Sequence, residues 1–193
     1  MIWYAPYGSN LAWQRFRFYL EGGYLAANNR HHAGARDPSP PKAWSPIWMP
    51  GQAYFATLSA FWGGGRGLFD ADAPGIAASR AWLITPQQFC DVVAQEMKRE
   101  PGEDFGLPTQ RGQRVSLGDG HYETAVCVGS LNHYPVVTFG PSFSMGDVEP
   151  LAPAPAYRAM ILSGLRETFG WDKARADKYL DSLSGARPRE LVA

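Results

Sequence analysis

The chain has 193 residues, of which 45% are hydrophobic and 19% are charged, and its 18 basic side chains balance its 18 acidic ones. This length and composition predict one globular domain and exclude a disordered chain. The absence of net charge argues against nucleic acid and anionic membranes as partners. No apolar run reaches about 18 residues and no signal sequence is recognisable, so we expect a cytoplasmic protein that does not enter a membrane.

Cysteine and histidine are scarce and lack the spacing of metal ligands. Cys90 and Cys127 are the two cysteines, and both are expected to be buried, reduced thiols. His31 and His32 are adjacent in a polar segment, an arrangement that suits a metal ion poorly without further ligands. The sequence therefore predicts no metal site.

The first segment combines a predicted strand, a turn and a predicted helix. Met1–Tyr7 is apolar and aromatic nearly throughout, which favours a central strand. Gly8, Ser9 and Asn10 form the turn, and a helix is expected from Leu11 with Ser9 or Asn10 as its cap. Such a turn directs backbone N–H groups at one point, with the helix dipole behind them. It attracts a carboxylate, a phosphate or a developing oxyanion.

A long loop and a glycine run follow the first helix. Residues 28–51 are polar and rich in proline, which disfavours a helix and predicts a long surface loop. Gln52–Ser59 has the composition of a strand and precedes the glycines at 63–65. These glycines form either a flexible turn or a pocket wall that a ligand or the first turn approaches closely. Both interpretations stay open.

A helix with well-marked local signals is predicted from Thr85. Two short strands, Gly67–Phe69 and Ala81–Ile84, precede it. Thr85 caps the helix, Gln88 completes a capping box, and the helix is expected to run to about Arg99. Its apolar stripe consists of Phe89, Val92, Val93 and Met97.

Glu96 lies on this apolar stripe. A carboxylate there must be paired, desolvated or both, because burying an isolated charge is costly. A desolvated carboxylate in a pocket suits a general acid or base. The alternatives are a salt bridge, or a stripe edge that reaches solvent. Glu96 is thus the candidate catalytic residue.

The remainder of the chain predicts a hairpin and two helices. His121–Val128 and Tyr134–Phe139 read as two strands joined by a turn. Tyr157–Phe169 predicts a helix with one apolar face, and a shorter helix follows it. The single domain is expected to span residues 1–183, with 184–193 as a frayed tail.

The chain resembles the γ-glutamylcyclotransferase-like family in segments that occur in the family's order. They are Tyr7-Gly8-Ser9-Asn10-Leu11, Trp62-Gly63-Gly64-Gly65, Trp82-Leu83-Ile84-Thr85, Gln95-Glu96 and Pro153-Ala154-Pro155-Ala156-Tyr157. This resemblance implies an α+β fold, in which a mixed β-sheet, partly closed into a barrel, is surrounded by helices. Pro6 departs from the family's usual alanine, and Met97–His121 has no counterpart.

The resemblance also implies a cofactor-free enzyme that acts on a small γ-glutamyl compound. Glu96 is then the general base and acid, and residues 7–11 bind the substrate. The N–H groups of that turn hold the α-carboxylate or polarise the γ-carbonyl. Tyr157 orients the substrate or Glu96, or else packs in the core. Cleavage of the γ-glutamyl amide yields 5-oxoproline and an amine.

Other functions fit the same residues. A non-catalytic binding protein, or an acyl-transfer enzyme for another substrate, can be built on the same fold. A hydrolase that uses Cys90 or Cys127 is disfavoured, because no motif ties a histidine to either thiol. The position of Glu96 on an apolar stripe favours an enzyme.

Overall fold

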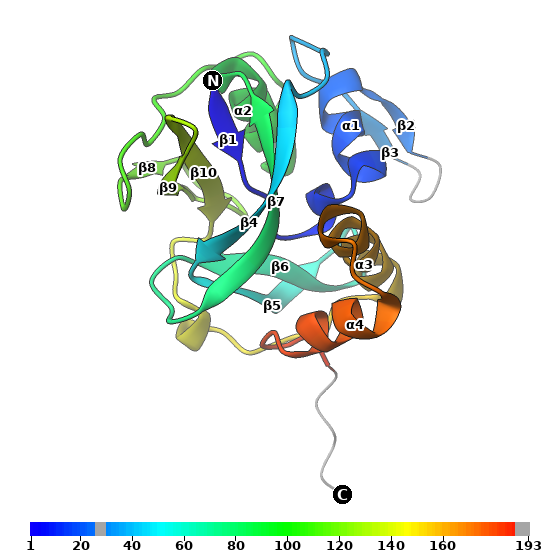
Figure 1. Cartoon of the computed structure of the whole chain (residues 1–193). Coiled ribbons are helices and arrows are strands. Elements are labelled where there is room, and N and C mark those ends of the chain that lie inside the picture. The colour runs from blue at the N-terminus through cyan, green and yellow to red at the C-terminus, as the bar shows by residue number, and fades with distance from the viewer. Residues whose placement is uncertain (26–29, 188–193) are drawn as a thin grey trace, which may run out of the picture.

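The computed structural model describes residues 1–25 and 30–187 and has an α+β fold built on one mixed sheet (Figure 1). The six strands of this sheet are β1 (Ile2–Tyr4), β4 (Ala43–Pro50), β7 (Ile76–Ile84), β8 (Arg114–Ser116), β9 (Thr124–Leu131) and β10 (Tyr134–Gly140). Their order across the sheet is β4-β7-β1-β10-β9-β8. β1 is antiparallel to β7 and parallel to β10, so it is a central strand as predicted.

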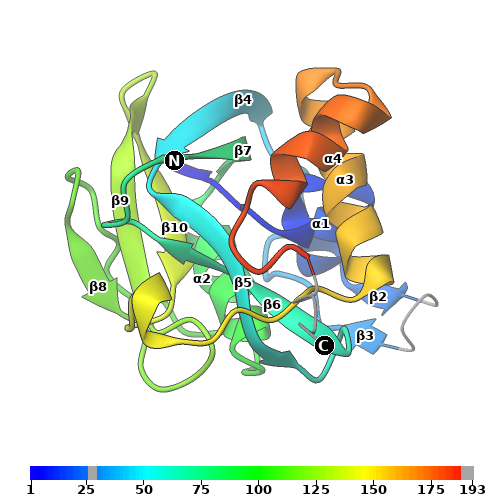
Figure 2. The same ribbon diagram turned by 90° about the horizontal axis from the view of Figure 1, so that it is seen from below.

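The other described strands form two antiparallel hairpins. One pairs β5 (Gln52–Ser59) with β6 (Gly64–Asp70), and the other pairs β2 (Gly23–Leu25) with β3 (Arg30–His32). The β5–β6 hairpin lies against one face of the large sheet (Figure 2). Its apolar side chains join those of β1, β9 and β10 in one core cluster. The strand predicted over Gln52–Ser59 is confirmed with its bounds.

In the described part of the chain, four α-helices and two short 3-10 helices surround the strands. They are α1 (Trp13–Glu21), α2 (Pro86–Glu96), α3 (Pro155–Phe169), α4 (Lys173–Asp181), η1 (Ser9–Leu11) and η3 (Met145–Asp147). The capping box of α2 is confirmed: the Thr85 hydroxyl accepts a hydrogen bond from the Gln88 N–H, and the Thr85 N–H donates to the Gln88 side chain, both at 3.0 Å. This reciprocal pair fixes the start of the helix that carries Glu96.

Side chains of β1 point alternately to two layers of the core, as the pleat of a strand dictates. Tyr4 packs with Phe16 of α1 and Phe89 of α2, on the face of the sheet that these helices cover. Trp3 points the other way and packs in the cluster that contains Phe69 of β6. The end of β1 therefore lies between the helical layer and the β5–β6 hairpin.

The first helix begins later than predicted. Ser9–Leu11 form η1, and α1 starts at Trp13 after Ala12, which makes no side-chain capping bond. Neither Ser9 nor Asn10 is the cap. Asn10 is buried and its amide is directed at groups inside the fold instead.

The loop predicted over residues 28–51 also needs correction, because it contains β3 and β4; residues 28 and 29 lie outside the described ranges. β4 is an edge strand that pairs on one side with β7. An edge strand tolerates Pro46 and Pro50, since a missing N–H there interrupts no second ladder. Proline content alone was therefore a misleading sign of a loop.

The chain from Ser184 is packed rather than frayed in its described part. The Phe55 N–H donates to the Ser184 carbonyl at 2.8 Å, and Ala186 is buried. Ser184 and Ala186 are thus packed against the fold, and the rest of the predicted tail, 188–193, lies outside the described residues. Within residues 1–25 and 30–187, no helix has both the length and the apolarity needed to cross a bilayer.

Candidate active site

A cavity of about 90 Å³ lies at the end of β1, between the η1 turn, the C-terminus of α2, the β5–β6 hairpin and α3. Six of the predicted site residues line it, namely Tyr7, Gly8, Ser9, Asn10, Glu96 and Tyr157. Leu11, also predicted to belong to the binding turn, does not line this cavity; its side chain is buried in the cluster of α3 and α4. It packs there because the absence of a side chain at Gly164 lets α3 approach η1 closely.

Glu96 is the last residue of α2, and its half-buried side chain reaches the cavity. The Asn10 side-chain Nδ2 donates to Glu96 Oε1 at 3.0 Å and to the Tyr4 hydroxyl at 3.2 Å. Asn10 is fixed from behind as well, because its carbonyl accepts from the Trp82 indole N–H at 2.9 Å. The turn and the carboxylate, 86 residues apart in sequence, therefore meet through one side chain.

Four tyrosines surround this carboxylate, of which Tyr122 is half-buried and the other three are buried. Burial raises the pKa of Tyr4, Tyr7, Tyr122 and Tyr157, and the negative charge of Glu96 raises the pKa of each further. Both effects disfavour a second negative charge beside the first. The phenols therefore remain protonated at neutral pH. Tyr7 and Tyr122 use their hydroxyls to donate to the Phe139 and Gly67 carbonyls, at 2.8 and 3.4 Å.

The Tyr157 hydroxyl is enclosed by two glycines. A Cβ added at Gly8 would lie 2.7 Å from this oxygen, and one added at Gly67 would lie 2.6 Å from it. The ring of Tyr157 stacks on Trp62 with 4.9 Å between the ring centroids. Tyr157 is thus held by close contacts on both sides, and its hydroxyl end faces the cavity.

The glycines at 63–65 play a different part from a ligand-binding wall. A Cβ at Gly65 would lie 1.8 Å from the Leu151 carbonyl oxygen, and one at Gly64 would lie 2.4 Å from the Ala154 nitrogen. The Gly65 N–H donates to the Ala152 carbonyl at 2.7 Å. Close backbone approach is what these two glycines permit, but the neighbour is the segment before α3. That segment runs beside the hairpin in Figure 2.

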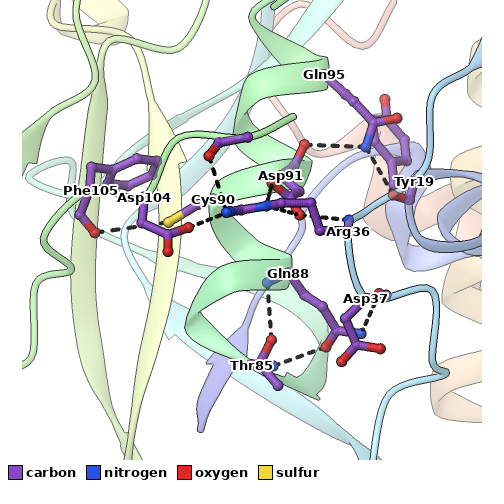
Figure 3. Close-up of polar contacts among 11 residues, drawn as sticks. Tyr19, Arg36, Asp37, Thr85, Gln88, Cys90, Asp91, Gln95, Asp104 and Phe105 are labelled. Carbon is purple, nitrogen blue, oxygen red and sulfur yellow. Dashed lines mark hydrogen bonds and ion pairs between the residues drawn. The ribbon is translucent and has the colours of Figure 1, made fainter. Parts of the chain in front are cut away.

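Polar contacts fix α2 to its surroundings and so fix the position of Glu96 (Figure 3). Asp91 is fully buried and accepts from Arg36 Nε at 3.0 Å and from the Arg36 N–H at 2.9 Å. Gln95, next to Glu96, donates to the Tyr19 carbonyl at 2.9 Å and accepts from the Gly34 N–H at 3.3 Å. Both α1 and the segment after β3 are therefore tied to the last two turns of α2.

Among the lining residues that the sequence did not predict, four carry or can carry positive charge. They are Arg15, Arg66, Lys98 and His121. Burial lowers the pKa of His121, and the charges of Arg66 and Lys98 lower it further. Lys98 and His121 belong to the segment without a counterpart in the resemblance, and it does border the cavity. Arg15 had a signal in the sequence, since it precedes the core residue Tyr19 by one helical turn.

The two cysteines lie away from these lining residues. Cys90 Sγ is directed at the Phe105 carbonyl and Cys127 Sγ at the Gly129 carbonyl. Burial raises the pKa of both thiols, which lowers the thiolate fraction that a nucleophile needs. In the part of the chain that the structure describes, no three His, Cys, Asp or Glu side chains are grouped so as to hold a metal ion.

Comparison with known sequences gives one partial relative. No family model matches the chain. Histone deacetylase 5 of Arabidopsis thaliana is 27% identical over 201 residues, which cover 93% of this chain and 30% of the plant protein. The chain therefore spans less than a third of that relative's length.

Solved structures share the fold along the whole chain. An uncharacterized human protein, loc79017, matches with a TM-score of 0.56 at 17% identity, over 100% of this chain and 91% of its own. A gamma-glutamyl cyclotransferase matches with a TM-score of 0.53 at 14% identity over the same shares. YkqA of Bacillus subtilis matches with a TM-score of 0.51 at 14% identity, over 95% of this chain and 55% of its own. The chain therefore has the γ-glutamylcyclotransferase-like fold, as the resemblance implied.

Proposed function

We propose that this protein is a γ-glutamylcyclotransferase-like enzyme, which converts a γ-glutamyl amide into 5-oxoproline and a free amine. The observation that carries the proposal is the contact between the turn and the carboxylate. Glu96 lines the cavity together with Gly8, Ser9 and Asn10, and Asn10 Nδ2 lies 3.0 Å from Glu96 Oε1. A base and a group of polarising donors are thus presented to one small space.

Glu96 acts first as a base in this scheme. It accepts one proton from the α-ammonium of the substrate, and the neutral amine attacks its own γ-carbonyl carbon. A second proton leaves the attacking nitrogen for solvent. The tetrahedral intermediate then collapses as the bond to the leaving nitrogen breaks and Glu96 gives its proton to that nitrogen. Every step uses substrate atoms and one carboxylate, so the scheme requires no cofactor.

The η1 turn supplies the electrostatic half of the scheme. The N–H groups of Leu11 and Ala12 are used within the turn, where they donate to the Gly8 and Ser9 carbonyls at 3.1 Å. The N–H groups of residues 8–10 are the ones proposed to hold the α-carboxylate or the oxyanion. Tyr157 is proposed to orient the substrate through its protonated hydroxyl.

Positioning supplies much of the proposed rate acceleration. The nucleophile and the electrophile belong to one molecule and close a five-membered ring, so binding in the folded-back conformation removes most of the entropic cost.

The test is 5-oxoproline release from a panel of γ-glutamyl amines and peptides. We expect wild type to release 5-oxoproline and Glu96→Gln to lower the rate about 10²- to 10⁴-fold, the usual contribution of a general acid or base. Glu100→Gln removes an exposed carboxylate just beyond α2 and is expected to match wild type. Equal rates in wild type and Glu96→Gln contradict the role of Glu96. Binding without turnover on any substrate would identify a binding protein instead.

A further inference from the structure

Arg15 is a buried cation at the cavity and has no carboxylate partner among the described residues. Its side chain is in the first turn of α1, and the residue is 2% exposed. Nη1 lies 2.7 Å from His32 Nε2, and Nη2 donates to the Tyr19 hydroxyl at 2.9 Å. Nε is buried and has no hydrogen-bond partner among the described residues. Because a guanidinium can only donate, His32 accepts through Nε2 and is neutral in this contact.

The surroundings of Arg15 are aromatic and neutral. Its guanidinium lies over the rings of Tyr19 and Phe61, at 4.7 and 5.4 Å from their centroids. Arg80 offers a comparison, since it is 7% exposed and lies over two aromatic rings, but it also pairs with Glu167 at 3.1 Å. No such ion pair joins Arg15 to an acidic residue within the described part of the chain. A buried positive charge without a counter-ion from the protein is costly unless a ligand supplies the anion.

The charges that line the cavity also favour an anionic ligand. Its lining contains the cations Arg15, Arg66 and Lys98, whereas Glu96 is its one acidic residue. Arg66 is half-buried and is occupied in part by the Thr57 hydroxyl and the Leu58 carbonyl, each at 3.3 Å. The positive field of Arg15 extends to Tyr157, where it opposes the increase in pKa that burial and Glu96 produce. The cavity is thus suited to a ligand with more negative than positive charge.

We propose that Arg15 binds a carboxylate of the substrate inside this cavity, a proposal that rests on the proposed function for the identity of the ligand. The planar fork of an arginine matches the two oxygens of a carboxylate. A γ-glutamyl compound offers its α-carboxylate, and a leaving amine that is an amino acid offers a second one. The chemistry of the contact is the same in both cases.

The experiment compares three ligands that differ by single carboxylates. γ-Glutamyl-alanine carries two, γ-glutamyl-ethylamine carries only the α-carboxylate, and the α-amide of γ-glutamyl-ethylamine carries none. Dissociation constants are measured by calorimetry on Glu96→Gln, which is expected to cleave the ligands at least about 100-fold more slowly than wild type, with and without Arg15→Gln. Arg17→Gln is the control, because Arg17 is exposed on the same helix, where it pairs with the neighbouring surface residue Glu21 and lies over the ring of Phe18.

We expect Arg15→Gln to weaken binding about 10- to 100-fold for each ligand that carries the contacted carboxylate. The α-amide should bind equally to both proteins, and Arg15→Lys should recover part of the loss. Weakening of γ-glutamyl-alanine alone assigns Arg15 to the leaving amine, and weakening of both acids assigns it to the α-carboxylate. Equal weakening of all three ligands, or no change in any, would overturn the proposal, because structural damage does not discriminate between acid and amide.

A ligand without a bond to cleave distinguishes failure of the proposed function from failure of the Arg15 proposal. Glutarate has two carboxylates and no amide, and its binding is followed by the increase in Tm of wild type and Arg15→Gln. If no γ-glutamyl compound binds or is cleaved, an increase in Tm that disappears in Arg15→Gln still supports the anion site. An increase of equal size in both proteins, or none in wild type, would then refute it.

Discussion

Replacing Gly67 by alanine tests how tightly the fold holds Tyr157 at the cavity. Gly67 lies in β6, and a Cβ there would meet the Tyr157 hydroxyl oxygen at 2.6 Å but the ring carbon that carries it only at 3.5 Å. The backbone of Gly67 does not have a positive φ, so alanine itself is allowed there. The whole conflict is therefore with one oxygen atom. Overpacking of this kind costs about 1–3 kcal/mol.

A double-mutant cycle with Tyr157→Phe measures how much of the free-energy cost of Gly67→Ala comes from this contact. Phenylalanine removes the oxygen and leaves an ordinary van der Waals contact of 3.5 Å. Gly67→Ala is therefore expected to lower the free energy of unfolding by about 1–3 kcal/mol in wild type and by less than about 0.5 kcal/mol in Tyr157→Phe. Urea unfolding of the four proteins measures the coupling. Equal losses in the two backgrounds would refute the steric argument.

Gly129→Ala is the matched control for this cycle. Gly129 is also in a strand, β9, and a Cβ there would meet no atom within 4 Å. Its substitution is expected to change the free energy of unfolding by less than about 0.5 kcal/mol. Activity should separate the two glycines as well, because Gly67→Ala displaces Tyr157 from the cavity and lowers kcat/KM, whereas Gly129→Ala leaves it unchanged.

Asn10→Ala removes the hydrogen bond to the proposed base and is expected to lower kcat/KM about 10- to 100-fold in the 5-oxoproline assay; an unchanged value would contradict that contact. Asp91→Ala removes a fully buried carboxylate that accepts from the Arg36 N–H and Nε, and it should lower the free energy of unfolding by about 1.5–3 kcal/mol. The loss should be less than about 1 kcal/mol for Asp104→Ala, which removes the exposed partner of Arg36. Equal losses of the two variants in urea unfolding would contradict this. The hydrogen bond from Lys173 lowers the pKa of Asp177 in the folded protein. The stability that this carboxylate contributes is therefore fully present above its unfolded pKa of about 4. It is lost as the pH falls through the folded pKa. Urea titrations between pH 6 and pH 3 check this, and a pH-independent midpoint would refute it.

Local signals in the sequence were sufficient for the elements that are stabilised locally. The capping box of Thr85 and Gln88 lies within one helical turn, and its residues predict α2 without knowledge of the rest of the fold. Gly170 ends α3 in the left-handed conformation, at the position expected from the end of the apolar pattern. β4 was missed because its strand character comes from pairing with β7, a partner more than 25 residues further along the chain.

The candidate site also has residues that local sequence signals predict and contacts that depend on how distant elements pack. Glu96 and the turn were identified from the sequence, but their contact runs through Asn10 and depends on how β1 and α2 pack. Arg15 follows the same turn and was passed over, because a lone arginine on a helix is usually solvated. Its burial depends on His32, Tyr19 and Phe61, which three separate elements bring together. Leu11 matched the family's pattern and yet packs in the core, so a motif residue need not face the ligand.

Intramolecular attack is the central claim, and the fate of oxygen tests it most directly. Wild type is incubated with a γ-glutamyl amide that it cleaves, in water labelled with ¹⁸O, and the acyl product is examined by mass spectrometry. Attack by the substrate's own amine predicts 5-oxoproline without ¹⁸O, at a rate that falls about 10²- to 10⁴-fold in Glu96→Gln. Glutamate that carries one ¹⁸O would show that water is the nucleophile, and would contradict the account.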